Sequence, residues 1–180
     1  IDHGYAATTI ERVANEAGVA IQTVYSAFGN KRTILSRIMD LAIGGDDQSL
    51  PLLERSEPQA MRAEPNQYRQ LELMAHGISA ILSRAGPIFV VMQAAAHIEP
   101  EIAALHQNLQ SERLLNMRRI IGWVSANGPL KPGLSEAQAT DLLWTLTSAD
   151  LWRLLVRERH WTDAQFERWL ATTLIANLLP

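Results

Sequence analysis

The sequence predicts an all-α protein with a small N-terminal helical unit and a larger C-terminal one. Apolar residues recur at the three- and four-residue spacing of amphipathic helices along most of the chain, and no useful stretch alternates as a β-strand does. Helix-capping patterns precede several of these apolar runs. Hydrophobic residues make up 47% of the 180 residues, which is enough to form a globular core.

The first predicted helices are short, and a tight turn joins them. Thr8 and Glu11 form a capping pattern, which predicts a helix over Thr9–Ala17. Gly18 follows where a helix end favours a left-handed residue, and a second helix is predicted over Ile21–Phe28. This arrangement is a helix-turn-helix, whose second helix fits the major groove of DNA. The alternative is an ordinary corner between two helices.

The helix-turn-helix is expected to close around a small apolar core. Val19, Val24 and Phe28 are expected to face inward, and Ala14 is small where the two helices cross. Asn30 should cap a further helix that begins at Lys31 and ends at the glycine pair 44–45. That helix joins the predicted first domain, residues 1–45, to the second, residues 46–180.

The second domain is predicted to begin with a loop and to continue as long helices. Residues 44–66 are polar, contain three prolines and suggest one helical turn near Pro58–Arg62. Gly86 and Pro87 are expected to interrupt the chain between two helices. The predicted helices cover Gln67–Arg84, Ile88–Ile98, Pro100–Ala126, about Ser135–Val156, and the segment from Thr162 to the last residues.

Residues 4–35 carry a more specific pattern than the helix-turn-helix alone. The informative residues are Gly4-Tyr5, Thr8-Thr9, Val13-Ala14, Ala17-Gly18-Val19, Thr23-Val24-Tyr25, Phe28 and Lys31. Together they closely resemble the DNA-binding signature of the TetR (tetracycline repressor) family. The resemblance implies that Gly4-Tyr5 end a first helix, whose front and any basic arm lie before Ile1. It also implies a transcriptional regulator that binds double-stranded DNA.

The exposed face of the second short helix supplies the candidate base contacts. Gln22 can pair bidentately with adenine, and Ile21 can contact a thymine methyl group. The resemblance implies that Thr23, Tyr25 and Lys31 contact the DNA backbone, which positions the protein without specifying sequence. The full set of predicted DNA-binding residues is Thr8, Thr9, Ile21, Gln22, Thr23, Tyr25, Ser26 and Lys31. The alternative for each is a solvated helix face.

Charge does not by itself indicate a nucleic-acid-binding protein. The net charge is −3, and the acidic and basic residues of the first 45 positions balance. This argues against a strong electrostatic footprint on DNA. The placement of Lys31 and Arg32 at a helix N-terminus still favours a phosphate, because the first backbone N–H groups of a helix are free.

The last two predicted helices carry more apolar surface than a small domain readily hides. Two such helices from each of two subunits can form a four-helix bundle, and a two-fold dimer would place two recognition helices about 34 Å apart, one DNA turn. The TetR resemblance, looser over residues 100–180, also implies a homodimer. The predicted interface residues are Trp152, Leu155, Phe166, Trp169, Leu170 and Thr173. The alternative is an ordinary intrachain core.

The middle helices could enclose a ligand, and the resemblance implies an inducer pocket there. No strongly charged anchor is evident, so a small apolar or aromatic effector is expected. The predicted lining is Met74, Ile78, Ile81, Phe89, Met92, Gln93, His97, Leu114, Met117, Ile121, Trp144 and Thr147. For any one of these residues, the alternative is plain core.

Other function classes find little support in the sequence. The chain has no cysteine, its histidines lack metal-ligand spacing, and no catalytic elbow or phosphate loop is present, so no enzyme, metal or cofactor is expected. No apolar run reaches the roughly 18 residues of a membrane span, so no membrane partner is expected, and the absence of cysteine fits a reducing cytoplasm. The sequence therefore predicts a ligand-responsive repressor of a palindromic operator. The alternative is a small-molecule binding or sequestering protein that shares the fold without binding DNA.

Overall fold

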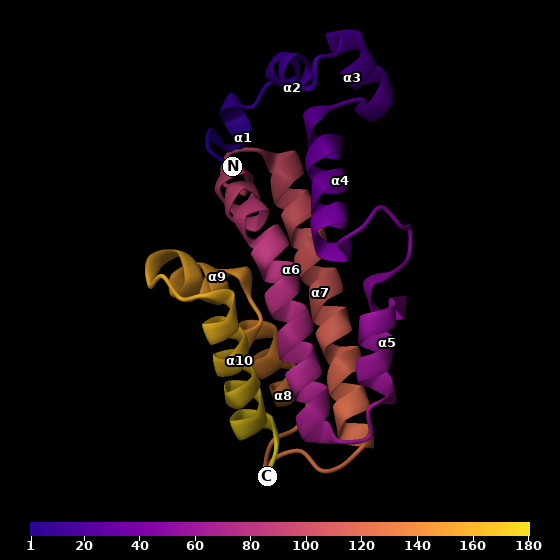
Figure 1. The fold of residues 1–180 in the computed structure, drawn as a ribbon, viewed down its shortest axis with the longest axis vertical. Coiled ribbons are helices and arrows are strands. Elements are labelled where there is room, and N and C mark those ends of the chain that lie inside the picture. Colours follow the sequence, from indigo (N-terminus) through magenta and orange to yellow (C-terminus); the bar gives the residue numbers. More distant parts are fainter.

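The computed structural model describes residues 1–180 and contains helices only, which confirms the all-α prediction (Figure 1). The helix-turn-helix lies at the N-terminus, and a larger helical region follows it. The elements are α1 (Gly4–Ala7), α2 (Ile10–Ala17), α3 (Ile21–Phe28), α4 (Lys31–Gly44), η1 (Leu52–Glu54), α5 (Ser56–Ala63), α6 (Gln67–Ala96), α7 (Pro100–Ala126), α8 (Glu136–Leu146), α9 (Ala149–Trp152), η2 (Arg153–Glu158) and α10 (Asp163–Leu178).

The molecule is elongated, with a head at one end of a long helical body. We call residues 1–30, which contain α1 to α3, the head, and residues 46–180 the body. Helix α4 descends from the head alongside α6 and α7, which form the axis of the body, while α10 packs on α6 and α8 packs on α7 (Figure 1). The C-terminus lies at the end of the body farthest from the head.

Three apolar clusters hold these elements together. The largest contains 19 buried residues and fills the body between α5, α6, α7, α8 and α10. The second joins α4 to α6 and α7, and consists of Leu35, Met39, Ala85, Met92, Ala95, Ile102 and Leu105. The third lies inside the head and consists of Ile10, Ala14 and Val24. The head thus has its own small core and connects to the body through the second cluster.

Helix α6 is continuous from Gln67 to Ala96, so the predicted break at Gly86-Pro87 is wrong. A proline inside a helix costs about 3 kcal/mol, because it lacks the N–H and clashes with the preceding turn. The helix packs against apolar side chains on both sides of this point, with Leu82 before it and Met92 after it. Burying each such side chain contributes roughly 1.5–3 kcal/mol, so tertiary packing outweighs the local penalty.

Because it is uninterrupted, α6 has the length and composition of a membrane-spanning helix. An 18-residue window within it has a mean hydropathy of 1.4, contrary to the expectation that no apolar run would be long enough. However, α4, α5, α7 and α10 all pack around α6 in the body. Its apolar character therefore corresponds to the central position that it occupies in the bundle.

The predicted helix over Ser135–Val156 is also wrong in its extent, because α8 ends at Leu146. Thr147 donates its hydroxyl to the carbonyl of Leu143, and Ser148 accepts from the backbone N–H of Leu151 to begin α9. A π-helical segment follows over Arg153–Glu158. Local side-chain hydrogen bonds of this kind compete with helix continuation and explain the break.

Several smaller predictions are confirmed or corrected. Long helix α7 spans Pro100–Ala126 as predicted, and the capping boxes before α8 and α10 both form. Gly4 and Tyr5 open the short helix α1 instead of ending a helix. The segment predicted as a loop with one turn holds both η1 and α5, because Leu53 and Met61 bury against α6 and its neighbours.

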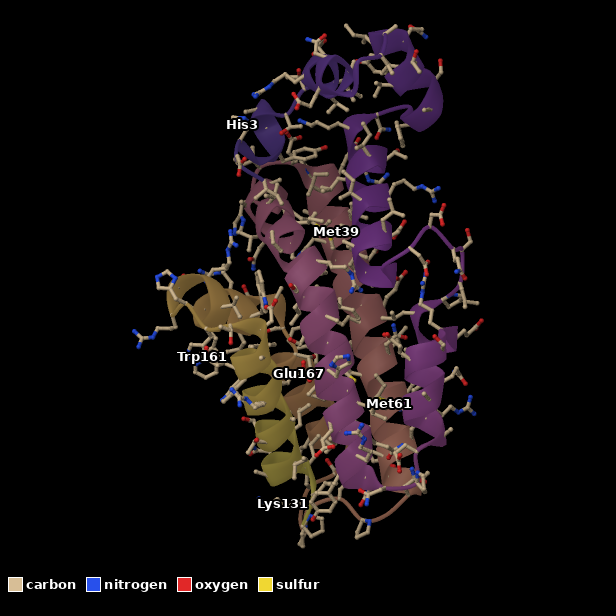
Figure 2. All side chains as sticks on the ribbon, in the orientation of Figure 1. His3, Met39, Met61, Lys131, Trp161 and Glu167 are labelled. Carbon is tan, nitrogen blue, oxygen red and sulfur yellow. The ribbon has the colours of Figure 1, made fainter.

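Helix α10 is tied to α6 by polar contacts as well as by the core. The hydroxyl of Ser83 donates to the Asp163 carboxylate at 2.9 Å, and the His76 ring lies 3.1 Å from the Glu167 carboxylate. Glu167 lies where α10 faces α6 in Figure 2. These contacts hold the N-terminal half of α10 against the axis of the body.

Gly86 provides a test of the packing at the middle of α6. A Cβ atom on this residue would fall 2.6 Å from the ring of buried Trp152, so Gly86→Ala forces the indole or the helix to move. We expect a loss of about 1–3 kcal/mol in the free energy of unfolding, as overpacking typically causes. Urea denaturation measures it.

Gly77→Ala is the matched control on the same helix, because no atom lies within 4 Å of its added Cβ. Alanine is favoured over glycine inside a helix by up to about 1 kcal/mol, so this variant should be neutral or more stable. Equal stabilities of the two variants would show that Trp152 does not require the glycine.

Candidate nucleic-acid interface

The head forms a compact helix-turn-helix because a few side chains pack between α2 and α3. Ala14 and Val24 are buried at the crossing, and partly buried Ile34 of α4 packs on the same cluster. Val24 faces inward as predicted. Val19 and Phe28 are 42% and 40% exposed, so their assignment to the head core is wrong, because α2 and α3 are too short to cover them.

Local signals position α3, the candidate recognition helix. Gly18 has φ 65° and ψ 30°, a left-handed conformation that ends α2 as predicted. Helix α2 is capped by Thr9, whose side chain accepts from the backbone N–H of Arg12, so the predicted cap at Thr8 is displaced by one residue. Helix α3 then lies at the end of the molecule opposite the C-terminus (Figure 1).

The outer face of α3 presents the predicted base-contacting residues together. Ile21 is 41% exposed and Tyr25 is 44% exposed, while Val24 between them is buried. Gln22, Thr23 and Ser26 are exposed as well. The face therefore offers an amide, hydroxyl groups and apolar atoms, which are the groups that contact base edges and thymine methyls in a major groove.

The other predicted contacts have partners within the head. The Thr8 hydroxyl donates to the carbonyl of Gly4 at 2.8 Å, which closes α1. The Lys31 ammonium donates to the carbonyl of Tyr5 at 2.9 Å and lies 3.9 Å from the centre of the Tyr5 ring. Lys31 thus anchors α1 to the start of α4. Any phosphate contact by Lys31 would share the ammonium with Tyr5.

Two features of the head were not indicated by the sequence pattern. The Arg12 guanidinium donates to the carbonyl of Ala7 at 3.1 Å, so a second cation is engaged with the backbone of α1. Tyr5 packs against the cluster between α4 and the body, and its pKa is raised by burial and by Glu99 and Glu101. The contacts that hold the head therefore engage the cationic side chains of Arg12 and Lys31.

Comparison with known families identifies this N-terminal unit. Residues 1–38 match the model of bacterial regulatory proteins, tetR family. This N-terminal unit is therefore a helix-turn-helix domain of the tetR type. Its helix-turn-helix is thus a DNA-binding domain of a transcriptional regulator, as the sequence predicted. Comparisons with curated proteins and with solved structures gave no match.

The start of α3 lacks a capping side chain. Ala20 occupies the N-cap position, and no side chain there caps the helix. The first N–H groups of α3 therefore lack the usual side-chain acceptor.

The predicted dimer residues divide into two groups by burial. Trp152, Phe166 and Leu170 are buried in the core of the protomer itself, so their assignment to a subunit interface is wrong. Phe166 and Leu170 are on the side of α10 that packs against α6 and α8, and Trp152 of α9 packs at Gly86 of α6, so all three fill the core of the body. Leu155, Trp169 and Thr173 are only partly buried. For these three residues, the interface stays a prediction.

The predicted ligand pocket is not open in this structure. A cavity of about 10 Å³, enough for one water molecule, lies between α6, α7 and α9. Its lining consists of Phe89, Val90, Gln93, His106, Gln110, Ala149 and Asp150. Phe89 and Gln93 are the two predicted pocket residues among them. His97 and Leu114 are exposed at the surface, so their assignment to an enclosed pocket is wrong.

The remaining predicted pocket residues belong to the cores or border them. Met74, Ile78, Met117 and Ile121 are buried in the main cluster of the body, and Trp144 packs against it. Met92 is buried between α4 and α6, where Ile81 packs as well. The hydroxyl of buried Thr147 bonds within its own helix turn. These side chains fill the space between the helices.

A partly buried arginine beside the cavity was missed by the sequence analysis. Both terminal nitrogens of Arg113 donate to the carbonyl of Trp144, at 2.8 and 2.7 Å, and the guanidinium lies 4.6 Å from the centre of the Trp144 ring. Burial lowers the pKa of Arg113 to about 10, and Asp150 opposes this effect. Arg113 thus supplies hydrogen-bond donors to a backbone carbonyl in the last turn of α8. It also places a positive charge next to the cavity.

Lys31→Met tests whether the anchor to Tyr5 and the predicted phosphate contact are separate. Loss of the ammonium removes the bond to the Tyr5 carbonyl, so affinity for DNA should fall by about tenfold through a less ordered head. If Lys31 also contacts a phosphate, the slope of log affinity against log salt should fall by about one unit.

A salt titration of DNA binding measures both effects, and Arg37→Met is the control, since Arg37 is exposed on α4 with no bond to the head. An unchanged slope with reduced affinity would assign Lys31 to anchoring alone. Unchanged affinity and slope would contradict both roles.

Proposed function

We propose that this protein is a homodimeric repressor that binds a palindromic operator and is released by a small apolar or aromatic ligand. The observation that carries the proposal is the exposed outer face of α3, which presents Ile21, Gln22 and Tyr25 at the end of the head. A regulator that reads bases with one short helix specifies only a few base pairs. A second copy related by two-fold symmetry supplies the rest of the site.

The dimer is supported by the unpaired surface of the C-terminal helices. Trp169 remains partly exposed although its ring packs at a tilt of 39° against Phe166 and meets Trp161 edge-on, with ring centres 5.8 and 6.1 Å away. Trp161 lies on the outer side of the body, near the loop before α10 (Figure 2). Aromatic side chains at a surface are typical of interface cores. A pairing through α10 would hold two heads at a fixed separation.

Release by a ligand is supported by the position of the small cavity. It adjoins Phe89 and Gln93 of α6, and the same stretch of α6 packs on α4 through Ala85 and Met92. Pockets that bind organic ligands have volumes of roughly 300–1,000 Å³, so an effector would enter only by separating α6 from α7 and α9. Separation there would shift α4 and the head, and the ligand would favour the open state by its differential affinity.

This function fits a regulator that acts on DNA in the cytoplasm. Repression is the sign of regulation that we propose, since a bound dimer would occupy the operator until the effector binds. A protein that only sequesters the effector would have the same fold, and it would not select DNA.

Random-site selection with this protein tests the proposed DNA recognition. We expect enrichment of a palindrome whose half-sites are centred about one helical turn apart. Gln22→Ala should relax the selection at one base pair in each half-site and weaken that site by about 1–3 kcal/mol. Tyr25→Phe should weaken all sequences alike, because it removes only a hydroxyl suited to phosphate. Selection of no sequence would leave the sequestering protein as the better description.

Trp169→Glu tests the proposed dimer. A buried, unpaired carboxylate at the interface would strongly oppose association, so the variant should be monomeric by light scattering. Leu115→Glu is the control, because Leu115 is also an exposed apolar residue but lies on α7. Circular dichroism checks that both variants stay helical. A folded Trp169→Glu variant that remains dimeric would exclude this face of α10 as the interface.

A further inference from the structure

The carboxyl end of α4 is bound by two arginines from outside the helix. A helix leaves its last four carbonyls without partners inside the helix, here those of Leu41–Gly44. The Leu41 carbonyl accepts from the N–H of Gly45 at 2.8 Å. Arg84 of α6 serves the next two: its Nε donates to the Ala42 carbonyl at 3.0 Å, and its Nη2 reaches the Ile43 carbonyl at 3.5 Å.

Arg55 completes this set from the other side. Its Nη1 donates to the carbonyl of Gly44 at 3.0 Å and to the carboxylate of Asp46 at 2.7 Å. Its Nη2 donates to the carbonyl of Gln48 at 3.0 Å. The side chain is only 14% exposed, and Arg55 lies between η1 and α5, which packs on α6. Every terminal carbonyl of α4 therefore has a donor.

The glycine pair at the end of α4 leaves room for these side chains. A Cβ atom on Gly44 would fall 2.6 Å from Nη2 of Arg55, although the backbone there is helical. Gly45 has a φ of 81°, and an added Cβ would lie 3.2 Å from Nη2 of Arg84. Any larger residue at position 44 would therefore have to displace the Arg55 guanidinium, which is a requirement for glycine beyond ending the helix.

Charge favours the same arrangement. The carboxyl end of a helix carries partial negative charge, which attracts cations. The bond from Arg55 lowers the pKa of the Asp46 carboxyl, and the N–H of Gln48 adds to the effect. Asp46 in turn orients Arg55 toward Gly44. We refer to Arg55 and Arg84, with the four carbonyls that they and Gly45 serve, as the α4 clamp.

The clamp lies at the end of α4 opposite the head, so a small rotation of α4 at the clamp moves the head by a larger distance. Helix α4 has 14 residues and is about 21 Å long, and the head is attached at its other end. A tilt of roughly 5° about the clamped end would move the other end by about 2 Å, as the helix length dictates. Small changes at the clamp therefore change the position of α3.

We propose that Arg55 and Arg84 are positioning residues for DNA recognition, which fix the direction of α4 and thereby the separation of the two recognition helices. The proposal rests on the proposed function, in which a dimer binds two half-sites. The residues contact no DNA. They act by holding α4 in one direction relative to α6.

A positioning role and a purely stabilising role make different predictions. A stabilising cap would alter the melting temperature and weaken binding to every operator by the same factor. A positioning clamp determines which half-site spacing fits the dimer. Its loss should reduce the preference for the best spacing, because the two heads then sample several separations.

The first experiment measures binding to the selected palindrome and to versions with one base pair added to or removed from its centre. We expect Arg84→Gln and Arg55→Gln each to reduce the preference for the best spacing by at least about threefold, the size of a modest loss of coupling. Arg69→Gln is the matched control, because Arg69 lies on α6 and pairs only with Glu72 at the surface. It should keep the preference of the parent protein.

A second pair consists of a variant that displaces Arg55 without removing its charge and a control variant. Gly44→Ala should reproduce the effect of Arg55→Gln, although alanine is normally favoured in a helix. Gly77→Ala, where the added Cβ meets no atom within 4 Å, should leave spacing preference unchanged. Unchanged preference in all three clamp variants would overturn the proposal.

A third measurement does not depend on DNA. The chain has no cysteine, so spin labels can be attached at Glu16→Cys in the head and Glu112→Cys in the body, both exposed. In dimers diluted with unlabelled protein, Arg84→Gln or Gly44→Ala should broaden the distance distribution, and Arg69→Gln should not. Distance distributions of equal width in the parent protein and in these two variants would overturn the proposed role of the clamp. Absence of any spacing preference in the parent protein, with broadened distances in the variants, would instead refute the palindrome-binding dimer.

Discussion

The contact between α4 and the body determines how this molecule can act on DNA. Met39 is fully buried between α4, α6 and α7, as Figure 2 indicates, and Leu35 packs beside it against the second half of α6. The head has only three buried core residues of its own, too few to orient it independently. Its direction therefore depends on its attachments to the body, which are α4 and the packing of α1 on α6. Under the proposed function, a shift of the second half of α6 would therefore act on the exposed face of α3 through these attachments.

Local chemistry made much of this fold predictable. Gly18 and the capping boxes before α8 and α10 act through backbone geometry within a few residues, and all were located from sequence. The errors occurred where distant residues decide. Pro87 predicts a break between two helices, but apolar packing before and after it keeps α6 continuous. Thr147 reads as helix interior, but Arg113 supplies donors to the end of α8, which permits the break there.

The residues of the candidate sites also divide into those that the sequence could predict and those that depend on distant contacts. The exposed face of α3 follows from helical period and from the family resemblance, so its residues could be named in advance. Period alone could not separate Phe166 and Leu170, which lie in the protomer core, from Trp169, which reaches the surface. Arg55 and Arg84 have no sequence signal at all, because their partners are backbone carbonyls 11 and 42 residues away.

The weak charge of the head gives this architecture a consequence for specificity. Arg12 of the head and Lys31 at the start of α4 already donate to carbonyls in α1, so little positive charge is free to attract phosphates regardless of sequence. Under the proposed function, discrimination then depends on the base contacts proposed for α3, such as that of Gln22. Base contacts form only when the helix lies within a few tenths of an ångström of the right depth and register. A head with little electrostatic attraction therefore needs a more rigid α4 than a strongly basic one, since charge cannot compensate for a misplaced helix.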